Sequence, residues 1–294
     1  MDSTKAPPQK DFLQGETTKV KIREIAFENI LNFRDVGRTV NELSGTKIMK
    51  EGLLFRSAKP DAASPSDRDA LITTYGIHTI IDLRSKTEHL ARIKQIHPSS
   101  TIPASVPAIS LHFEISPIAY HYIDFNAGAL ERALVWQLSS RMRAINLISI
   151  NVLRPLGLTG LAVFSLRHAQ PQLLSLFTII SSPSAYPLII HCTHGKDRTG
   201  AMIALILLLL DISEDIIQAE YMMTEAALEV QKEERRKEMG NMGLGEDFVG
   251  CDKNYVRGIC GEIEKWGGVK GYLEEIGFDK GMQNTVRRTL LVDK

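Results

Sequence analysis

Apolar and polar residues follow one another in blocks that predict strands and helices in turn. Residues 79–83 are a short, mostly apolar run and predict a buried strand, and residues 67–75 before them show helical spacing, with Ser66 as the expected cap. A hairpin is predicted around residues 51–52, followed by a strand that ends near residue 57. Further helices are expected at residues 88–96, 219–239 and 252–265. This order predicts a single α/β domain with a central, mostly parallel sheet flanked by helices.

The two most apolar runs of the chain enclose a short polar segment. Residues 186–190 predict a strand, and residues 201–210 predict a helix that is far too short to span a bilayer and is expected to be buried against the middle of the sheet. Strand, tight loop and helix start form an arrangement that binds anions, because the first N–H groups of a helix lack intrahelical partners and the helix dipole is positive there. The enclosed segment reads His191-Cys192-Thr193-His194-Gly195-Lys196-Asp197-Arg198-Thr199-Gly200.

The residue types of this segment indicate which chemistry the loop supports. Cys192 is predicted to stand at the strand end, where the helix dipole, Lys196 and Arg198 favour the thiolate, which is a good nucleophile. Arg198 lies six positions on and can fold its planar guanidinium over a bound oxyanion with two hydrogen bonds. The hydroxyl of Thr199 can donate to the sulfur when sulfur is the leaving group. Gly195 permits backbone angles and close approaches that a side chain would block.

Three other interpretations of the loop explain it less well. A nucleotide-binding P-loop would need a glycine where Ile190 stands and Ser or Thr where Asp197 stands. A metal site from His191, Cys192 and His194 would place three ligands closer in sequence than usually converge on one ion. A purely structural cysteine would explain neither the arginine nor the glycines.

A second group of polar residues follows the predicted strand at residues 79–83. Asp82 and Arg84 lie at its carboxyl end, which is the edge of an α/β sheet where functional groups gather. They are therefore expected to face the same crevice as the loop of Cys192. The alternative is that they pair with each other, or with Arg56, for structural reasons.

Length, charge and cysteine content narrow the class of protein. The chain has 294 residues and a formal net charge of zero, so it can form one large domain and has no overall attraction for nucleic acid or for a membrane. Its three cysteines form no disulfide framework and suit a reducing, cytoplasmic compartment. No secretory signal is visible, and the polar residues 1–19 predict a disordered leader before a domain at 20–294.

Four separated blocks flank the loop from His191 to Gly200: Asn32-Phe33-Arg34-Asp35-Val36-Gly37, Leu54-Phe55-Arg56-Ser57-Ala58 and Ile81-Asp82-Leu83-Arg84-Ser85 before it, and Trp266-Gly267-Gly268-Val269 with Gly271-Tyr272-Leu273 after it. In this order the loop and the blocks resemble an atypical family of the cysteine-dependent protein tyrosine phosphatase superfamily, which includes bacterial secreted tyrosine and lipid phosphatases and also occurs in fungi. The resemblance spans roughly residues 25–291 and implies a tyrosine phosphatase-like fold. A minimal phosphatase does not need the predicted helices at residues 129–180. These residues are therefore expected to be a helical insertion, which either forms a lid or braces the sheet.

The resemblance implies hydrolysis of phosphate monoesters through a phosphocysteine, with no metal or other cofactor. Protein phosphotyrosine or dual-specificity substrates are the first expectation. Phosphoinositides or inositol phosphates are the alternative, because lipid phosphatases carry a lysine at the position of Lys196. Those enzymes often have another lysine where this chain has Thr193. An inactive phosphate-binding module and a sulfurtransferase or arsenate reductase are further alternatives, and the oligomeric state is left open.

The resemblance also assigns roles to individual residues. Residues 193–198 are expected to bind phosphate through backbone N–H groups and the Arg198 side chain, with His191, Arg56 and Arg84 as supporting residues. Asp197 is the first candidate for the general acid, since no Trp-Pro-Asp loop is present. Its neighbouring cations favour the ionised carboxylate, whereas an acid must carry a proton, so Asp82 and Asp124 remain alternatives.

Overall fold

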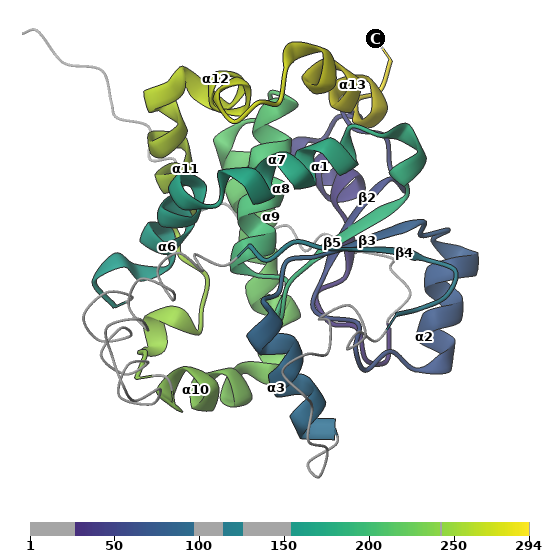
Figure 1. Cartoon of the computed structure of the whole chain (residues 1–294), viewed down its shortest axis with the longest axis vertical. Helices are drawn as coiled ribbons and strands as arrows, with labels where there is room; N and C mark the ends of the chain where they lie inside the picture. The colour runs from purple at the N-terminus through teal and green to yellow at the C-terminus, as the bar shows by residue number, and fades with distance from the viewer. Residues whose placement is uncertain (1–26, 97–113, 126–153, 242, 294) are drawn as a thin grey trace, which may run out of the picture.

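A five-stranded sheet forms the centre of the protein (Figure 1). The computed structural model describes residues 27–96, 114–125, 154–241 and 243–293. The strand order is β1-β2-β5-β3-β4, with β1 antiparallel to β2 and every other pair parallel. The predicted mostly parallel α/β sheet is thereby confirmed. The strands are β1 (Arg34–Asp35), β2 (Leu54–Ser57), β3 (Thr79–Asp82), β4 (Ala119–Tyr122) and β5 (Leu188–His191).

Successive side chains of the central strands enter two different cores. On β5, Leu188 and Ile190 join the larger core, whereas Ile189 between them joins the smaller one. This alternation is expected of a strand whose two faces are both covered. β3 behaves in the same way, with Ile81 in the larger core and Ile80 in the smaller one. The mostly apolar sequence of these strands therefore reflects burial on both faces.

Helices cover both faces of the sheet (Figure 1). The larger core includes α8 and residues of α1, α6, α7, α9, α11, α12 and α13, and the smaller core includes the segment after α2. The helices are α1 (Val36–Ser44), α2 (Pro65–Asp69), α3 (Lys86–Ile96), α6 (Arg154–His168), α7 (Gln170–Ile180), α8 (Asp197–Leu209), α9 (Glu214–Ala227), α10 (Lys232–Asn241), α11 (Tyr255–Ile263), α12 (Gly268–Glu275) and α13 (Lys280–Leu290).

The central helix α8 is apolar on nearly all sides. Ten of its residues are buried, including Ala201, Ile203 and Leu207, and it directly follows the loop after β5. A helix that is apolar all round needs neighbours on every side, and α6, α9, α11 and α12 all contact it. The predicted buried helix is confirmed. In the described part of the chain, no helix has the length and apolar character needed to cross a membrane.

Several local predictions were wrong. Residues 51–52 do not turn a hairpin; instead Met49 pairs with Leu291 of the C-terminal segment. The helix predicted at 67–75 begins at Pro65, because Ser64 rather than Ser66 accepts a hydrogen bond from the backbone of Asp67 and forms a capping box. Residues 70–74 continue as a π-helix. The helix predicted at 219–239 is divided into α9 and α10 by a single 3-10 turn at Glu229–Gln231.

The helices α6 and α7 lie in the region predicted as a helical insertion. Leu166, Leu173 and Phe177 are completely buried in the larger core, and α6 packs against α11. This packing favours the bracing alternative over a lid for residues 154–180. Residues 129–153, together with the predicted leader at 1–19, lie outside the described residues. The domain boundaries at 20–294 and 129–180 therefore stay predictions.

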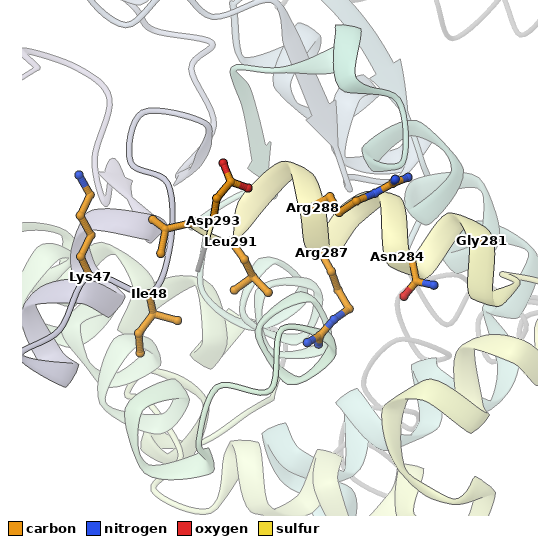
Figure 2. Close-up of a pocket in the computed structure, with 9 residues that line it drawn as sticks. Lys47, Ile48, Gly281, Asn284, Arg287, Arg288, Leu291 and Asp293 are labelled. Carbon is orange, nitrogen blue, oxygen red and sulfur yellow. The ribbon is translucent and has the colours of Figure 1, made fainter.

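A groove runs along α13 at the opposite end of α8 from the loop (Figure 2). It has a volume of about 780 Å³. Figure 2 shows Arg287 and Arg288 leaving α13 in different directions. Arg287 donates to the carbonyl of Leu209 and pairs with Asp211, so it caps the C-terminus of α8. The groove is thus separate from the loop at the helix N-terminus. Its lining comprises Lys47, Ile48, Gly281, Asn284, Arg287, Arg288, Leu291, Val292 and Asp293.

Candidate active site

The loop between β5 and α8 carries the residues that the sequence singles out. Cys192 directly follows β5, and its side chain lies in the larger core with 3% of the residue exposed. The backbone of residues 193–197 then turns sharply into α8. Gly195 has a φ of 64°, in the left-handed region that favours glycine. A Cβ at this position would lie 2.1 Å from the carbonyl oxygen of Ser57, so the close approach of β2 also requires glycine.

The carbonyls of residues 194–196 accept hydrogen bonds from two buried side chains, Asn32 and Arg56. Asn32 Nδ2 donates to the carbonyls of His194 at 3.1 Å and Gly195 at 2.9 Å, and Arg56 Nη2 donates to Gly195 at 2.6 Å and Lys196 at 3.4 Å. In a trans peptide the carbonyl of one residue and the N–H of the next point in opposite directions. The N–H groups of residues 195–197 therefore point away from Asn32 and Arg56. Within the described structure the N–H groups of residues 193–197 make no hydrogen bond, and such a cluster forms an oxyanion nest.

Arg198 is fixed by a carboxylate that the sequence did not indicate. Both Nη atoms of Arg198 donate to Glu88, each at 2.6 Å, and Thr193 Oγ1 donates to the same carboxylate. Burial alone would raise the pKa of Glu88, but the Arg198 guanidinium outweighs burial and holds that pKa well below its ordinary value. Glu88 is thus an anion that orients the guanidinium at the first turn of α8.

The sequence around Glu88 contains a helix-capping pattern. Glu88 lies three positions after Ser85, and the two form a capping box: the Ser85 N–H donates to Glu88 at 2.9 Å, and the Glu88 N–H donates to Ser85 Oγ at 3.3 Å. A pattern of Ser-x-x-Glu before a helix predicts this cap, but it does not predict that Glu88 also binds Arg198. Only the fold places α3 beside the loop, so the contact with Arg198 needed three-dimensional information.

Asp82 and Arg84 pair with each other, as the structural alternative anticipated. Arg84 binds both oxygens of Asp82 and both oxygens of Asp61, and all three residues are at least nine-tenths buried. Burial would raise the pKa of Asp82, but the charge and the hydrogen bonds of the Arg84 guanidinium act in the opposite direction and outweigh burial, so its pKa lies well below the ordinary value. A carboxylate held in its ionised form is a poor proton donor, and this argues against Asp82 as the general acid.

His191 lies completely buried beneath the loop. Its Nδ1 is 3.1 Å from the carbonyl of Cys192, and its Nε2 is 3.7 Å from Asp82 Oδ2. Burial lowers the pKa of His191, which favours the neutral ring. The ring therefore touches both the nucleophile's backbone and the Asp82–Arg84 pair, and this position fits the supporting role expected of it.

The Lys196 ammonium is bound by backbone carbonyls outside the loop and by the neighbouring carboxylate. Its Nζ donates to the carbonyls of Gly250 at 2.6 Å and Phe248 at 3.3 Å, and it lies 3.0 Å from Asp197 Oδ1. The side chain is almost fully buried by these contacts. Lys196 thus ties the loop to the segment before α11. The sequence could not show this, because the carbonyls it binds belong to backbone fifty residues away.

Asp197, the first candidate for the general acid, is accessible to solvent. It is the first residue of α8, and its side chain is 36% exposed. The Tyr221 hydroxyl lies 3.3 Å from Asp197 Oδ1, and the Tyr255 hydroxyl donates to the Asp197 carbonyl at 2.6 Å. The two tyrosine rings stack with centroids 4.4 Å apart. Asp124, the third candidate, is exposed and follows β4.

Thr199 and His194 complete the loop. The Thr199 hydroxyl is fully buried and has no hydrogen-bond partner among the residues that the structure describes. A buried hydroxyl without a partner is costly, and it is available to a group that enters or changes charge during a reaction. The His194 ring lies at the rim, with its Nε2 3.4 Å from Glu238 of α10. His194 can therefore contribute to an anion site through its backbone.

Comparison with known proteins identifies the family of this chain. The model of the tyrosine phosphatase family matches residues 25–292. The chain is 28% identical over 284 residues to the triple specificity protein phosphatase PtpB of Mycobacterium tuberculosis, covering 88% of this chain and 96% of the relative. A relative from Cupriavidus necator, also named for tyrosine-protein phosphatase activity, is 25% identical over 258 residues, covering 86% of this chain and 83% of the relative. Fold and loop define a cysteine-dependent phosphoric monoester hydrolase. The chain belongs to the tyrosine phosphatase family.

Proposed function

We propose that this protein hydrolyses phosphate monoesters with Cys192 as nucleophile and protein phosphotyrosine, or a broader set of phosphoresidues, as substrate. The observation that carries this proposal is the loop itself. A cysteine is followed by five N–H groups without partners in the described structure and by Arg198, which Glu88 holds at the same loop. Such a site can surround the three equatorial oxygens of a phosphoryl group, and positioning with charge stabilisation supplies most of the catalysis of phosphoryl transfer.

The reaction is proposed to proceed in two displacements. The Cys192 thiolate attacks phosphorus in line, so that the S–P bond forms as the ester P–O bond breaks, and Asp197 gives its proton to the leaving oxygen. Water then attacks phosphorus and gives a proton to Asp197, while the sulfur leaves as a thiolate. The buried Thr199 hydroxyl is proposed to donate to the sulfur at that point. Inorganic phosphate is the second product.

The position of Lys196 bears on the choice of substrate. A second cation facing the bound substrate would favour a head group with several phosphates, but the Lys196 ammonium is occupied by two backbone carbonyls and Asp197. This geometry supports protein phosphoresidues ahead of phosphoinositides or inositol phosphates. We also propose a cytoplasmic location, because the three cysteines are free and a catalytic thiolate survives in a reducing compartment.

Replacement of Asp197 with asparagine tests the assignment of the general acid. A poor leaving group needs protonation in the transition state, whereas a good one does not. We therefore expect Asp197→Asn to lower kcat for a phenyl phosphate by about a hundredfold or more. The same change should alter kcat only slightly for an aryl phosphate with an acidic phenol. The measurement is steady-state kinetics with both substrates across a range of pH.

Asp82→Asn serves as the comparison for this experiment. Because Asp82 binds Arg84 and lies beside the His191 ring that contacts the Cys192 carbonyl, its loss should reduce kcat for good and poor leaving groups by similar factors. Equal losses with both substrates in Asp197→Asn would contradict the assignment. A selective loss with the poor leaving group in Asp82→Asn would transfer the role to Asp82.

A further inference from the structure

Three charged side chains lie buried directly behind the catalytic loop. Arg34 Nε is 2.8 Å from one oxygen of Glu220, and Arg56 Nη1 is 2.6 Å from the other. None of the three side chains is more than 3% exposed. Each oxygen of a single carboxylate from α9 is therefore committed to a different guanidinium. The sequence pointed to Arg56 as a supporting residue, but it gave no sign of Glu220.

Stability alone does not account for this arrangement. Removing three charges from water is costly, and well-packed apolar side chains of similar volume commonly stabilise a protein at least as well. Burial would raise the pKa of Glu220, but Arg34 and Arg56 outweigh it, so the pKa is lowered and the carboxylate is ionised. The net charge of the three side chains is one positive charge. It is buried behind the anion-binding loop, on the side of the loop carbonyls.

Both arginines connect Glu220 to the loop carbonyls. Arg56 reaches Gly195 directly, with Nη2 2.6 Å from its carbonyl oxygen. Arg34 acts through Asn32: its Nη1 contacts the Asn32 side-chain oxygen, which leaves Nδ2 of that amide directed at the carbonyls of His194 and Gly195. Asn32 and Arg56 thus orient the loop peptides. Glu220 in turn orients both donors, because it binds Arg56 directly and binds Arg34, which contacts Asn32.

We propose that Glu220 is a positioning residue for phosphate binding. By fixing the two arginines it keeps the loop carbonyls turned outward and the N–H groups turned toward the phosphate, with one buried positive charge behind them. The proposal rests on the proposed function of the loop. It predicts an effect on binding of the phosphoryl group itself, since the N–H groups contact it in the ground state and in the transition state alike.

Replacement of Glu220 with glutamine tests this inference. The amide has one accepting oxygen, so one of the two arginines loses its partner and the loop peptides lose one support. We expect the inhibition constant of inorganic phosphate and the KM for an aryl phosphate both to rise about tenfold or more, with a smaller effect on kcat. Calorimetric titration with inorganic phosphate measures the same affinity without turnover.

A matched control is available in α11. Glu262 is also about 3% exposed and also holds two cations, Arg167 and Lys265, but it lies away from the loop. Glu262→Gln should lower the melting temperature without changing phosphate affinity. A purely structural role for Glu220 would give the same result in Glu220→Gln.

A second variant keeps the test decisive if Glu220→Gln does not fold. Asn32 has a φ of 56°, which suits glycine, so Asn32→Gly removes the amide donors without backbone strain. It should weaken phosphate binding in the same direction. A folded Glu220→Gln or Asn32→Gly protein with wild-type phosphate affinity would overturn the inference. Failure of the proposed function would appear separately, as a wild-type protein that binds inorganic phosphate but releases none from an ester.

Discussion

Replacement of Cys192 with serine is expected to abolish phosphate release, with a loss of at least about 10⁴-fold in kcat. A serine hydroxyl at this position is protonated at neutral pH and is a poor leaving group for the second displacement. The side chains have nearly the same size, and Cys192 is buried at the end of β5, so the fold should be retained. The measurement is phosphate release from an aryl phosphate in the presence of a chelator.

Cys260→Ser is the control for this experiment. Cys260 is a free, half-buried cysteine on α11, and burial raises its pKa to about 11, so it is not a nucleophile near neutral pH. Activity in Cys260→Ser should match that of the wild type. Substantial activity in Cys192→Ser, or loss of wild-type activity on adding the chelator, would contradict a thiolate mechanism that needs no metal.

Replacement of Arg198 with lysine is expected to lower kcat/KM by about 10³-fold or more, although the charge is kept. The reason is geometric: both Nη atoms bind Glu88, and a lysine cannot hold a carboxylate in this two-pronged way while it faces a phosphoryl group. The measurement is steady-state kinetics with an aryl phosphate, together with thermal unfolding to establish that the variant is folded.

A comparable arginine elsewhere in the chain supplies the reference. Arg167 binds Glu262 through Nε and Nη2, at 2.7 and 2.6 Å, on the outer side of α6 and α11. Arg167→Lys breaks a similar pair far from Cys192 and should leave kcat/KM close to the wild-type value. If Arg198→Lys were equally mild, the guanidinium would have no special part in binding the phosphoryl group.

The elements that carry the chemistry could be predicted because local sequence determines them. The run into Cys192 and the apolar residues of α8 predict strand and helix by pattern alone, and the loop between them follows from its glycines and its charged residues. Contacts between residues far apart in the sequence were harder to predict. The pairing of Asp82 with Arg84 was anticipated because the two residues lie only two positions apart, whereas the partner of Arg198 lies 110 positions away.

Three residues near the site that the sequence did not indicate were overlooked for one physical reason. Glu88, Glu220 and Asp61 are carboxylates that bind arginines brought close by the fold, and an isolated Asp or Glu in a sequence is usually solvated. The partners of Lys196 could not be predicted for the related reason that two of them are backbone carbonyls, which no residue type reveals. In each case the residue type set the charge, and only the packing of α3, α9, the segment between β2 and α2 and the segment before α11 set the partner.

Trapping of the covalent intermediate tests the central claim most directly. Wild-type protein is mixed with an aryl phosphate and a chelator, quenched rapidly with acid, digested and analysed by mass spectrometry. The account predicts one phosphoryl group on the peptide that contains Cys192, and none on that peptide in Cys192→Ser. Turnover with the phosphoryl group on a different residue, or with no phosphorylated enzyme at any quench time, would contradict it.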